Sequence, residues 1–143
     1  MANTVKIYID DKEYDVPAGA NLVDVAKFHA DNDIPVFCYH PKMAPVGMCR
    51  MCLVEMGSVQ RDQNTKEMMF DAEGKPQVRW MPKLQTACTQ TVSDGLVIRT
   101  STKVVEDARR NVVEFLLTSH PLDCPICDKG GECPLQNLTM QHG

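Results

Sequence analysis

Apolar and polar residues alternate at the start of the chain, from residue 4 to residue 10. The apolar positions on one side of this pattern are Val5, Ile7 and Ile9. A period of two predicts a half-buried strand. Residues 10–12 then turn the chain into a second strand over 13–16. This strand stops at residues 17–19, because proline removes a ladder donor and glycine permits unusual backbone angles.

The apolar period changes to three and four residues between Leu22 and about Ala30. The apolar residues at this spacing are Leu22, Val25, Ala26 and Phe28. Asn21 stands directly before them, where an asparagine side chain caps a helix. We expect the apolar face of this helix to lie on the hairpin. A hairpin followed by a packing helix predicts the start of a β-grasp fold.

Prolines interrupt the pattern between residues 34 and 47. They are Pro35, Pro41 and Pro45. Proline excludes regular structure, so we expect an irregular loop that carries Cys38 and leads to Cys49 and Cys52. Loops suit metal ligands, because they leave backbone N–H groups free to point at cluster sulfurs. A strand over 52–56 is expected to leave this loop.

A polar stretch over 57–81 predicts a long, exposed β-hairpin extension. Trp80 and Met81 close it, and we expect them to pack the hairpin onto the body of the domain. Strands are then predicted over 83–88 and 96–99, separated by a Ser-Asp-Gly turn. Cys88 would thus return to the loop that holds the earlier cysteines.

The strongest helical pattern begins at Ser101 or Thr102 and ends near Ser119. Its apolar positions include Val104, Val105, Ala108, Val112, Phe115 and Leu116. Residues 120–133 contain few large apolar side chains, so burial alone cannot keep them folded. A metal centre is the natural substitute for the missing core. A short helix is predicted over 134–140.

Composition narrows the function classes. The 143 residues suffice for one domain or for one with a small appendage. The 15 basic and 19 acidic residues form no basic stripe, which excludes a nucleic-acid partner. No apolar run is long enough to span a bilayer and no secretory signal precedes the first strand, so we expect a cytoplasmic protein without direct membrane insertion. Seven cysteines, an odd number, argue against a disulfide framework.

The cysteines divide into two sets of metal ligands. The first set is Cys38, Cys49, Cys52 and Cys88. Its single Cys-x2-Cys pair with two separate cysteines favours a binuclear iron–sulfur cluster over zinc, which more often uses two such pairs. The ten-residue gap after Cys38 departs from the plant-type ferredoxin spacing, whereas the expected β-grasp agrees with it.

The second set is His120, Cys124, Cys127 and Cys133. One histidine with three cysteines is also a standard composition of structural zinc sites, so residue types alone leave zinc and iron–sulfur open. Two details favour iron–sulfur. Prolines follow two of the cysteines directly, as in bacterial ferredoxins, and the glycine pair at 130–131 allows backbone N–H groups to approach inorganic sulfide.

Three stretches of sequence resemble one known family. They read IPVFC at 34–38, PVGMCRMCLVE at 45–55 and HPLDCPICDKGGECPLQ at 120–136. In them the chain resembles the N-terminal region of the large iron–sulfur subunit (subunit 3) of bacterial NADH:quinone oxidoreductase (complex I). The resemblance implies a [2Fe–2S] cluster on the first ligand set and a [4Fe–4S] cluster on the second, and it decides the second site against zinc.

The resemblance implies an α+β fold in two parts. Residues 1–100 would form a β-grasp 2Fe-2S ferredoxin-like domain with the hairpin insertion at about 57–81. Residues 101–143 would form a small helical, cluster-stabilised segment that binds the [4Fe–4S] cluster. The interval between Cys52 and Cys88 is longer than in most members of the family. Family members also continue beyond these two clusters, so we expect the remainder of a longer subunit to follow.

The function implied is one-electron transfer in the NADH dehydrogenase arm of a respiratory chain enzyme. The chain would be an enzyme subunit that carries electrons and has no substrate-converting site of its own. Its partners would be other NADH dehydrogenase subunits, including the flavin-bearing one, on the cytoplasmic side of the inner membrane. The alternatives are the equivalent module of an NAD-linked or iron-only hydrogenase or formate dehydrogenase, and a zinc-stabilised interaction module without redox activity.

Overall fold

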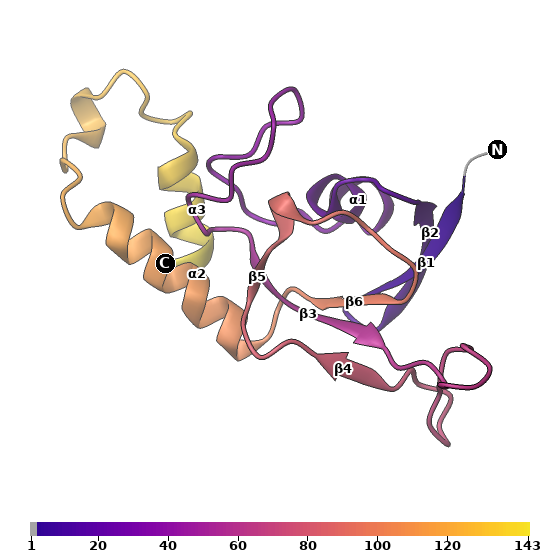
Figure 1. Ribbon diagram of the computed structural model, residues 1–143. Helices are drawn as coiled ribbons and strands as arrows, with labels where there is room; N and C mark the ends of the chain where they lie inside the picture. Colours follow the sequence, from indigo (N-terminus) through magenta and orange to yellow (C-terminus); the bar gives the residue numbers. More distant parts are fainter. Residues whose placement is uncertain (1–2) are drawn as a thin grey trace.

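The computed structural model describes residues 3–143 and contains one mixed sheet and three α-helices (Figure 1). The strands are β1 (Thr4–Ile9), β2 (Lys12–Pro17), β3 (Leu53–Val59), β4 (Val78–Trp80), β5 (Gln85–Thr86) and β6 (Leu96–Arg99). The helices are α1 (Leu22–His29), α2 (Lys103–Leu117) and α3 (Pro134–His142), with 3₁₀ turns η1 (Ala87–Thr89) and η2 (Cys124–Ile126). The predicted α+β fold class is confirmed.

The sheet has the strand order β2-β1-β6-β3-β4, and β5 pairs with β3 outside this path. β1 and β2 form the predicted hairpin, in which Ile9 lies opposite Lys12. Asp10 and Asp11 both have positive φ, at 49° and 70°, which gives the two-residue turn the twist of the flanking strands. β1 runs parallel to β6, while the other pairs are antiparallel. This mixed pairing places β1, near the start of the chain, directly beside β6.

Helix α1 covers one face of the sheet, as predicted (Figure 1). The Oδ1 of Asn21 accepts a hydrogen bond from the backbone N–H of Val23 at 2.9 Å and so caps the helix. The predicted core position Phe28 is wrong, because its side chain is 75% exposed. At 100° per residue, Phe28 lies about 140° from the middle of the face that buries Leu22 and Ala26. The helix therefore buries a narrower stripe than its apolar residues suggest.

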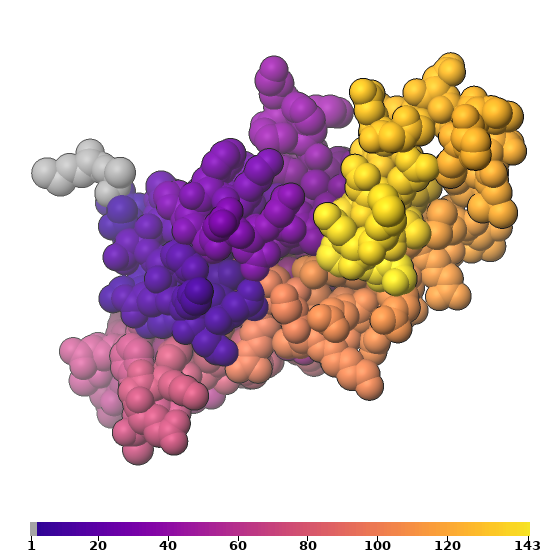
Figure 2. Space-filling model, turned by 180° about the vertical axis from the view of Figure 1, so that it is seen from behind, coloured from indigo at the N-terminus to yellow at the C-terminus, as the bar shows by residue number. Residues whose placement is uncertain are grey.

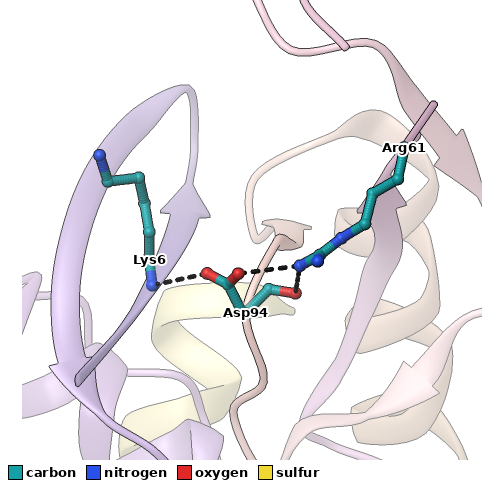
Figure 3. Close-up of polar contacts among 3 residues, drawn as sticks. All are labelled: Lys6, Arg61 and Asp94. Carbon is teal, nitrogen blue, oxygen red and sulfur yellow. Dashed lines mark hydrogen bonds and ion pairs between the residues drawn. The ribbon is translucent and has the colours of Figure 1, made fainter. Parts of the chain in front are cut away.

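The predicted extension over 57–81 is a hairpin between β3 and β4, with isolated bridges further out from Arg61 to Met68 and from Phe70 to Pro76. Its base is joined to the sheet by Asp94, which contacts both Arg61 and Lys6 (Figure 3). The guanidinium carbon of Arg99 lies 4.7 Å from the centroid of the Trp80 ring. This stacking, typical of a cation–π contact, agrees with the predicted packing role of Trp80.

The strand predicted over 83–88 is only partly present. β5 covers two residues, and Cys88 lies in the turn η1 instead of in a strand. β5 pairs with the first residues of β3 and not with β6, so the two segments do not form a hairpin with each other. The local sequence pattern predicts an extended segment, but the strand with which this segment pairs depends on the tertiary fold.

Helices α2 and α3 contact each other at one end of the sheet (Figures 1 and 2). Thr102 caps α2, and α3 confirms the short helix predicted at the end of the chain. The apolar face predicted for α2 is only half right: Val105 is buried, whereas Val104 and Phe115 are exposed and Arg109 is buried. No helix within residues 3–143 has the length and apolar character needed to cross a bilayer.

Candidate metal centres

The first predicted ligand set comes from four places in the fold. Cys38 lies in the irregular loop between α1 and β3, Cys49 lies near its end, Cys52 directly precedes β3, and Cys88 lies in η1. Cys52 and Cys88 are buried, whereas Cys38 and Cys49 are half-buried. All seven cysteines of the chain are free thiols. Two of the thiols therefore lie in the half-buried loop, and the other two lie in the buried core.

The Cys88 thiol interacts electrostatically with the other three thiols of this set. Burial raises the pKa of the Cys88 thiol to about 12, and contact with Cys52 and the negative charges of Cys52, Cys38 and Cys49 add to the rise. Burial opposes ionisation of Cys38 as well, but hydrogen bonds from Cys49 and from the backbone of Met48 outweigh it and lower its pKa. The repulsion of negative charge that contributes to the raised Cys88 pKa favours a cationic metal group at this place.

Backbone N–H groups point at the sulfurs of this site. The N–H of Cys88 donates to Cys52 Sγ, and that of Met51 donates to Cys49 Sγ, both at 3.5 Å. Gly47 and Arg50 have positive φ, at 70° and 62°, which folds the loop tightly around the cysteines. The left-handed conformation of Arg50 was not predicted from the sequence, since arginine carries no local signal for it.

The second predicted set lies beyond the end of α2. A cavity of about 520 Å³ is lined by all four of its members. They are His120, Cys124, Cys127 and Cys133. The end of α2 places His120, η2 places Cys124, and Cys133 stands at the N-terminal end of α3. The cavity is many times larger than the roughly 30 Å³ of a water molecule, so it offers room for a multi-atom group.

The remaining wall of this cavity is largely apolar, with Asp123, Gln136 and Thr139 as its polar members. Leu117, Leu122, Leu135 and Met140 contribute to it. A Cβ atom on Gly130 would lie 2.8 Å from the carbonyl oxygen of Cys124, so only glycine fits this turn. The backbone N–H of Gly131 donates to Gln136 Oε1 at 3.1 Å, which ties the loop to α3. Gln136 had no role in the sequence prediction.

Within residues 3–143 no three His, Cys, Asp or Glu side chains converge closely enough to hold one metal ion. Such an ion requires all its ligand atoms about 2.0–2.3 Å from a single point. A cluster distributes its ligands over two or four irons and needs no such convergence. Soft thiolates, free backbone donors and, at the second set, a sizeable cavity fit iron–sulfur groups at both places.

One buried charged residue near these sites was not predicted. Arg109 on α2 is 6% exposed, and no role was predicted for it from the sequence. The available signal was its spacing, since it stands four residues from both Val105 and Val113, the other buried positions of the helix.

Two family models together match most of the chain. Residues 2–103 match the 2Fe-2S iron-sulfur cluster binding domain. Residues 109–143 match the NADH-ubiquinone oxidoreductase-G iron-sulfur binding region. The first match contains the whole first ligand set and the second match contains the whole second set. The two predicted cofactors, a [2Fe–2S] and a [4Fe–4S] cluster, are confirmed by these matches.

Curated relatives carry names that agree with the resemblance found in the sequence. The chain is 42% identical over 139 residues to NADH-quinone oxidoreductase subunit 3 of Thermus thermophilus, covering 97% of this chain and 18% of that protein. It is 37% identical over 139 residues to the mitochondrial NADH-ubiquinone oxidoreductase 78 kDa subunit of Candida albicans, covering 97% of this chain and 16% of that protein. The chain thus spans less than a fifth of the length of these curated relatives.

A solved structure shares the fold. The crystal structure of an NAD+-reducing [NiFe]-hydrogenase in the H2-reduced state matches with a TM-score of 0.71 and 27% identity. The match covers 97% of this chain and 49% of that one.

Proposed function

The chain belongs to the family of 2Fe-2S iron-sulfur cluster binding domains, and from this premise we propose that it is an electron-transfer module of an NADH:quinone oxidoreductase. One observation carries the proposal: the two family matches follow each other along the chain, each around one complete ligand set. A single-cluster ferredoxin would lack the second match.

The proposed ligand assignment follows the two sets. Cys38, Cys49, Cys52 and Cys88 would hold the [2Fe–2S] cluster. His120, Cys124, Cys127 and Cys133 would hold the [4Fe–4S] cluster. The corresponding domains are residues 1–100, including the hairpin over 57–81, and residues 101–143. The interaction of Cys88 with the other three thiols supports the first assignment, and the shared cavity supports the second.

When bound, each cluster takes up and releases single electrons. The protein contributes the environment of that chemistry. Burial of Cys52 and Cys88 excludes water from one side of the first site, and backbone N–H groups reduce the negative charge on the sulfurs. At the second site, His120 supplies a neutral imidazole instead of a fourth thiolate, which raises the reduction potential relative to an all-cysteine site. Its other ring nitrogen can hold a proton.

The proposed assembly is the NADH dehydrogenase arm of a respiratory complex, on the cytoplasmic side of the inner membrane. Electrons would enter from a flavin-bearing subunit and leave toward quinone through further carriers. The names of the relatives support this assignment, since one is an NADH-quinone and the other an NADH-ubiquinone oxidoreductase subunit. The chain itself would convert no substrate.

A second candidate is the equivalent module of an NAD-linked hydrogenase. The specific observation in its favour is the fold shared with the NAD+-reducing [NiFe]-hydrogenase. The higher identity to the quinone oxidoreductase subunits favours the first candidate.

Anaerobic purification followed by metal analysis and EPR of the reduced protein tests the proposal. We expect iron and acid-labile sulfide, with one binuclear and one tetranuclear signal. A Cys52→Ala variant should lose the first signal alone, and a Cys124→Ala variant the second alone. Colourless protein that contains zinc would contradict the proposal and favour a zinc-stabilised interaction module. Reduction of both clusters by NADH after addition of a flavin-bearing NADH-oxidising subunit would support the assembly.

A further inference from the structure

Arg109 presents a buried guanidinium group on α2. Its side chain projects from α2 between the buried residues Val105 and Val113. Within residues 3–143, neither Nε nor Nη2 has a partner, and both atoms are inaccessible to solvent. A buried, unpaired guanidinium group is costly, and native proteins retain such groups where they serve a purpose.

The surroundings of Arg109 include one of the proposed cluster ligands. α2 packs against β3, and Cys52, which is 0% exposed, directly precedes β3 (Figure 1). Burial lowers the pKa of Arg109, while the negative charges of Asp10, Glu106 and Cys52 counteract this. The guanidinium stays protonated at physiological pH, because arginine keeps its charge in proteins even when it is buried. A permanent positive charge therefore lies within electrostatic range of the Cys52 sulfur.

Asp10 and Glu106 lie within electrostatic range of Arg109, but within residues 3–143 neither forms an ion pair with it. The Asp10 carboxylate already accepts hydrogen bonds from the backbone N–H of Thr100 at 2.8 Å and from Asn32 Nδ2 at 3.0 Å. His142 of α3 faces the same guanidinium, and burial together with this positive charge lowers the His142 pKa. Its imidazole is thus held neutral near Arg109. The carboxylates of Asp10 and Glu106 offset part of the guanidinium charge, and Cys52 is the third negative group that interacts with it.

We propose, resting on the function proposed above, that Arg109 raises the reduction potential of the cluster held by Cys38, Cys49, Cys52 and Cys88. Reduction adds one negative charge to the cluster and its thiolates. A fixed positive charge in a poorly solvated interface stabilises that reduced form more than the oxidised one. Arg109 is a positioning residue in this role: it places a charge and takes no part in electron transfer.

The geometry also makes this effect selective. Leu117, where α2 ends, lies about 12 Å beyond Arg109 at 1.5 Å per residue, and the second ligand set lies beyond that point. Charges that far apart are screened over a Debye length of about 8–10 Å where solvent intervenes. Arg109 should therefore act on the first cluster and much less on the second.

The test compares Arg109→Met with Arg110→Met in the full chain with both clusters loaded. Arg110 is the neighbouring exposed arginine on the same helix and is the matched control. In an EPR-monitored redox titration, Arg109→Met should decrease the ratio of reduced to oxidised first cluster about tenfold at a fixed potential, a shift of about 59 mV to lower potential. The second cluster and the Arg110→Met variant should shift far less. Arg109→Lys, which retains the charge, should stay near the wild type.

The possible outcomes distinguish an error in the proposed function from an error in the inference about Arg109. If the wild type loads no iron–sulfur clusters, the proposed function is wrong. If the wild type loads both clusters and Arg109→Met titrates like Arg110→Met, only the inference about Arg109 is wrong. If Arg109→Met does not load the first cluster, Arg109→Gln and Arg109→Lys provide the same neutral and charged comparison. Failure of all three Arg109 variants to load, with Arg110→Met intact, would show a purely structural residue and overturn the inference.

Discussion

Asn21 connects the start of α1 to the fourth cysteine of the first ligand set. Its Oδ1 accepts from the backbone N–H of Val23 at 2.9 Å, and its Nδ2 donates to the carbonyl oxygen of Cys88 at 2.7 Å. One side chain therefore caps a helix and fixes the turn that carries a proposed ligand. The first of these roles is readable from the sequence, whereas the second depends on a contact 67 residues away.

Two substitutions separate these roles. Asn21→Ala removes the cap and the bond to Cys88, and should lower the free energy of unfolding by about 1–2 kcal/mol. Asn21→Asp keeps the acceptor that caps the helix but loses the donor, so it should spare helix stability and reduce loading of the first cluster. Urea unfolding and EPR measure the two effects.

Thr102→Ala provides the control for the Asn21 variants. Thr102 caps α2 by accepting from Val105 N–H at 3.4 Å, and it lies on another helix. Its loss should cost stability without specific loss of the first cluster. Wild-type loading of that cluster in Asn21→Asp would contradict a positioning role for the amide.

Gly47→Ala should impair the first cluster. Gly47 has φ of 70°, and a Cβ there would lie 2.8 Å from the Thr89 Cγ2 atom, next to Cys88. The left-handed conformation alone costs about 1–2 kcal/mol for an L-residue, and the contact would push the loop away from η1. We expect reduced iron content and a weaker binuclear EPR signal. Gly74→Ala, with φ of 80° and nothing within 4 Å of its Cβ, should lose stability without this effect.

Asp94 should contribute more to the free energy of unfolding than its ion pair with Arg61 alone would contribute. Its Oδ2 accepts from Arg61 Nη2 at 2.8 Å, and its Oδ1 accepts from the backbone N–H of Lys6 at 3.2 Å (Figure 3). Exposed ion pairs contribute about 0–1 kcal/mol, so Arg61→Ala should have little effect on unfolding. Asp94→Ala also removes an acceptor for β1 and should cost more. Equal urea midpoints for the two variants would show that the Lys6 contact contributes nothing.

The elements predicted correctly are those set by local sequence. The hairpin of β1 and β2, the cap at Asn21, and helices α2 and α3 follow from apolar period, capping residues and prolines within a few positions. The errors arise where a distant partner decides. Phe28 has the right residue type for a core position but stands on the wrong side of α1. The 83–88 segment has strand character, but its pairing with β3 shortens it to two residues.

The candidate sites also combine features set by local sequence with features set by distant residues. Cysteine and histidine spacing predicted both ligand sets, because few side chains bind soft metals. Spacing carries no information about the groups that surround the ligands. Arg109, Gln136 and the left-handed Arg50 acquire their roles from residues elsewhere in the fold, through burial beside β3, a bond to Gly131 and closure of the cysteine loop. Arginine and glutamine are usually surface residues, so residue type alone gives no sign of these roles.

Tyr39 gives the protein a pH-dependent contribution to stability at alkaline pH. Burial raises its pKa to about 12, and the hydrogen bond to Asp24 Oδ2 at 2.8 Å together with the charge of Asp24 adds to the rise. A raised folded-state pKa means that this stability is fully present below pH 10.0, the ordinary value, and is lost as the pH rises to about 12. Negative charge on a loaded cluster would raise the Tyr39 pKa further.

Urea unfolding of wild type and Tyr39→Phe across alkaline pH tests this. Below pH 10 the wild type should exceed the variant by a constant margin, and the margin should fall between pH 10 and about 12. Asp24→Asn removes one cause of the shift and should narrow that interval. A margin that stays constant to pH 12 would contradict the role assigned to Tyr39.

The last prediction concerns the segment after α2. α3 has no buried residue, and Cys124 and Cys127 are exposed, so little apolar burial holds this segment to the rest of the chain. Its order should therefore depend on the metal group, as in small metal-stabilised domains. Cys127→Ala, or removal of iron by a chelator, should abolish hydrogen-exchange protection in residues 120–143, whereas the sheet retains it.

The first cluster serves as the internal control in the Cys127→Ala variant. Two of its proposed ligands, Cys52 and Cys88, are packed among buried apolar residues of the β-grasp core. The binuclear EPR signal should therefore persist after the tetranuclear signal is lost. Asp128→Ala, an exposed neighbour of Cys127, should leave both signals unchanged. Simultaneous loss of both signals in Cys127→Ala would show that the two sites are one cooperative unit, because independent sites fail separately.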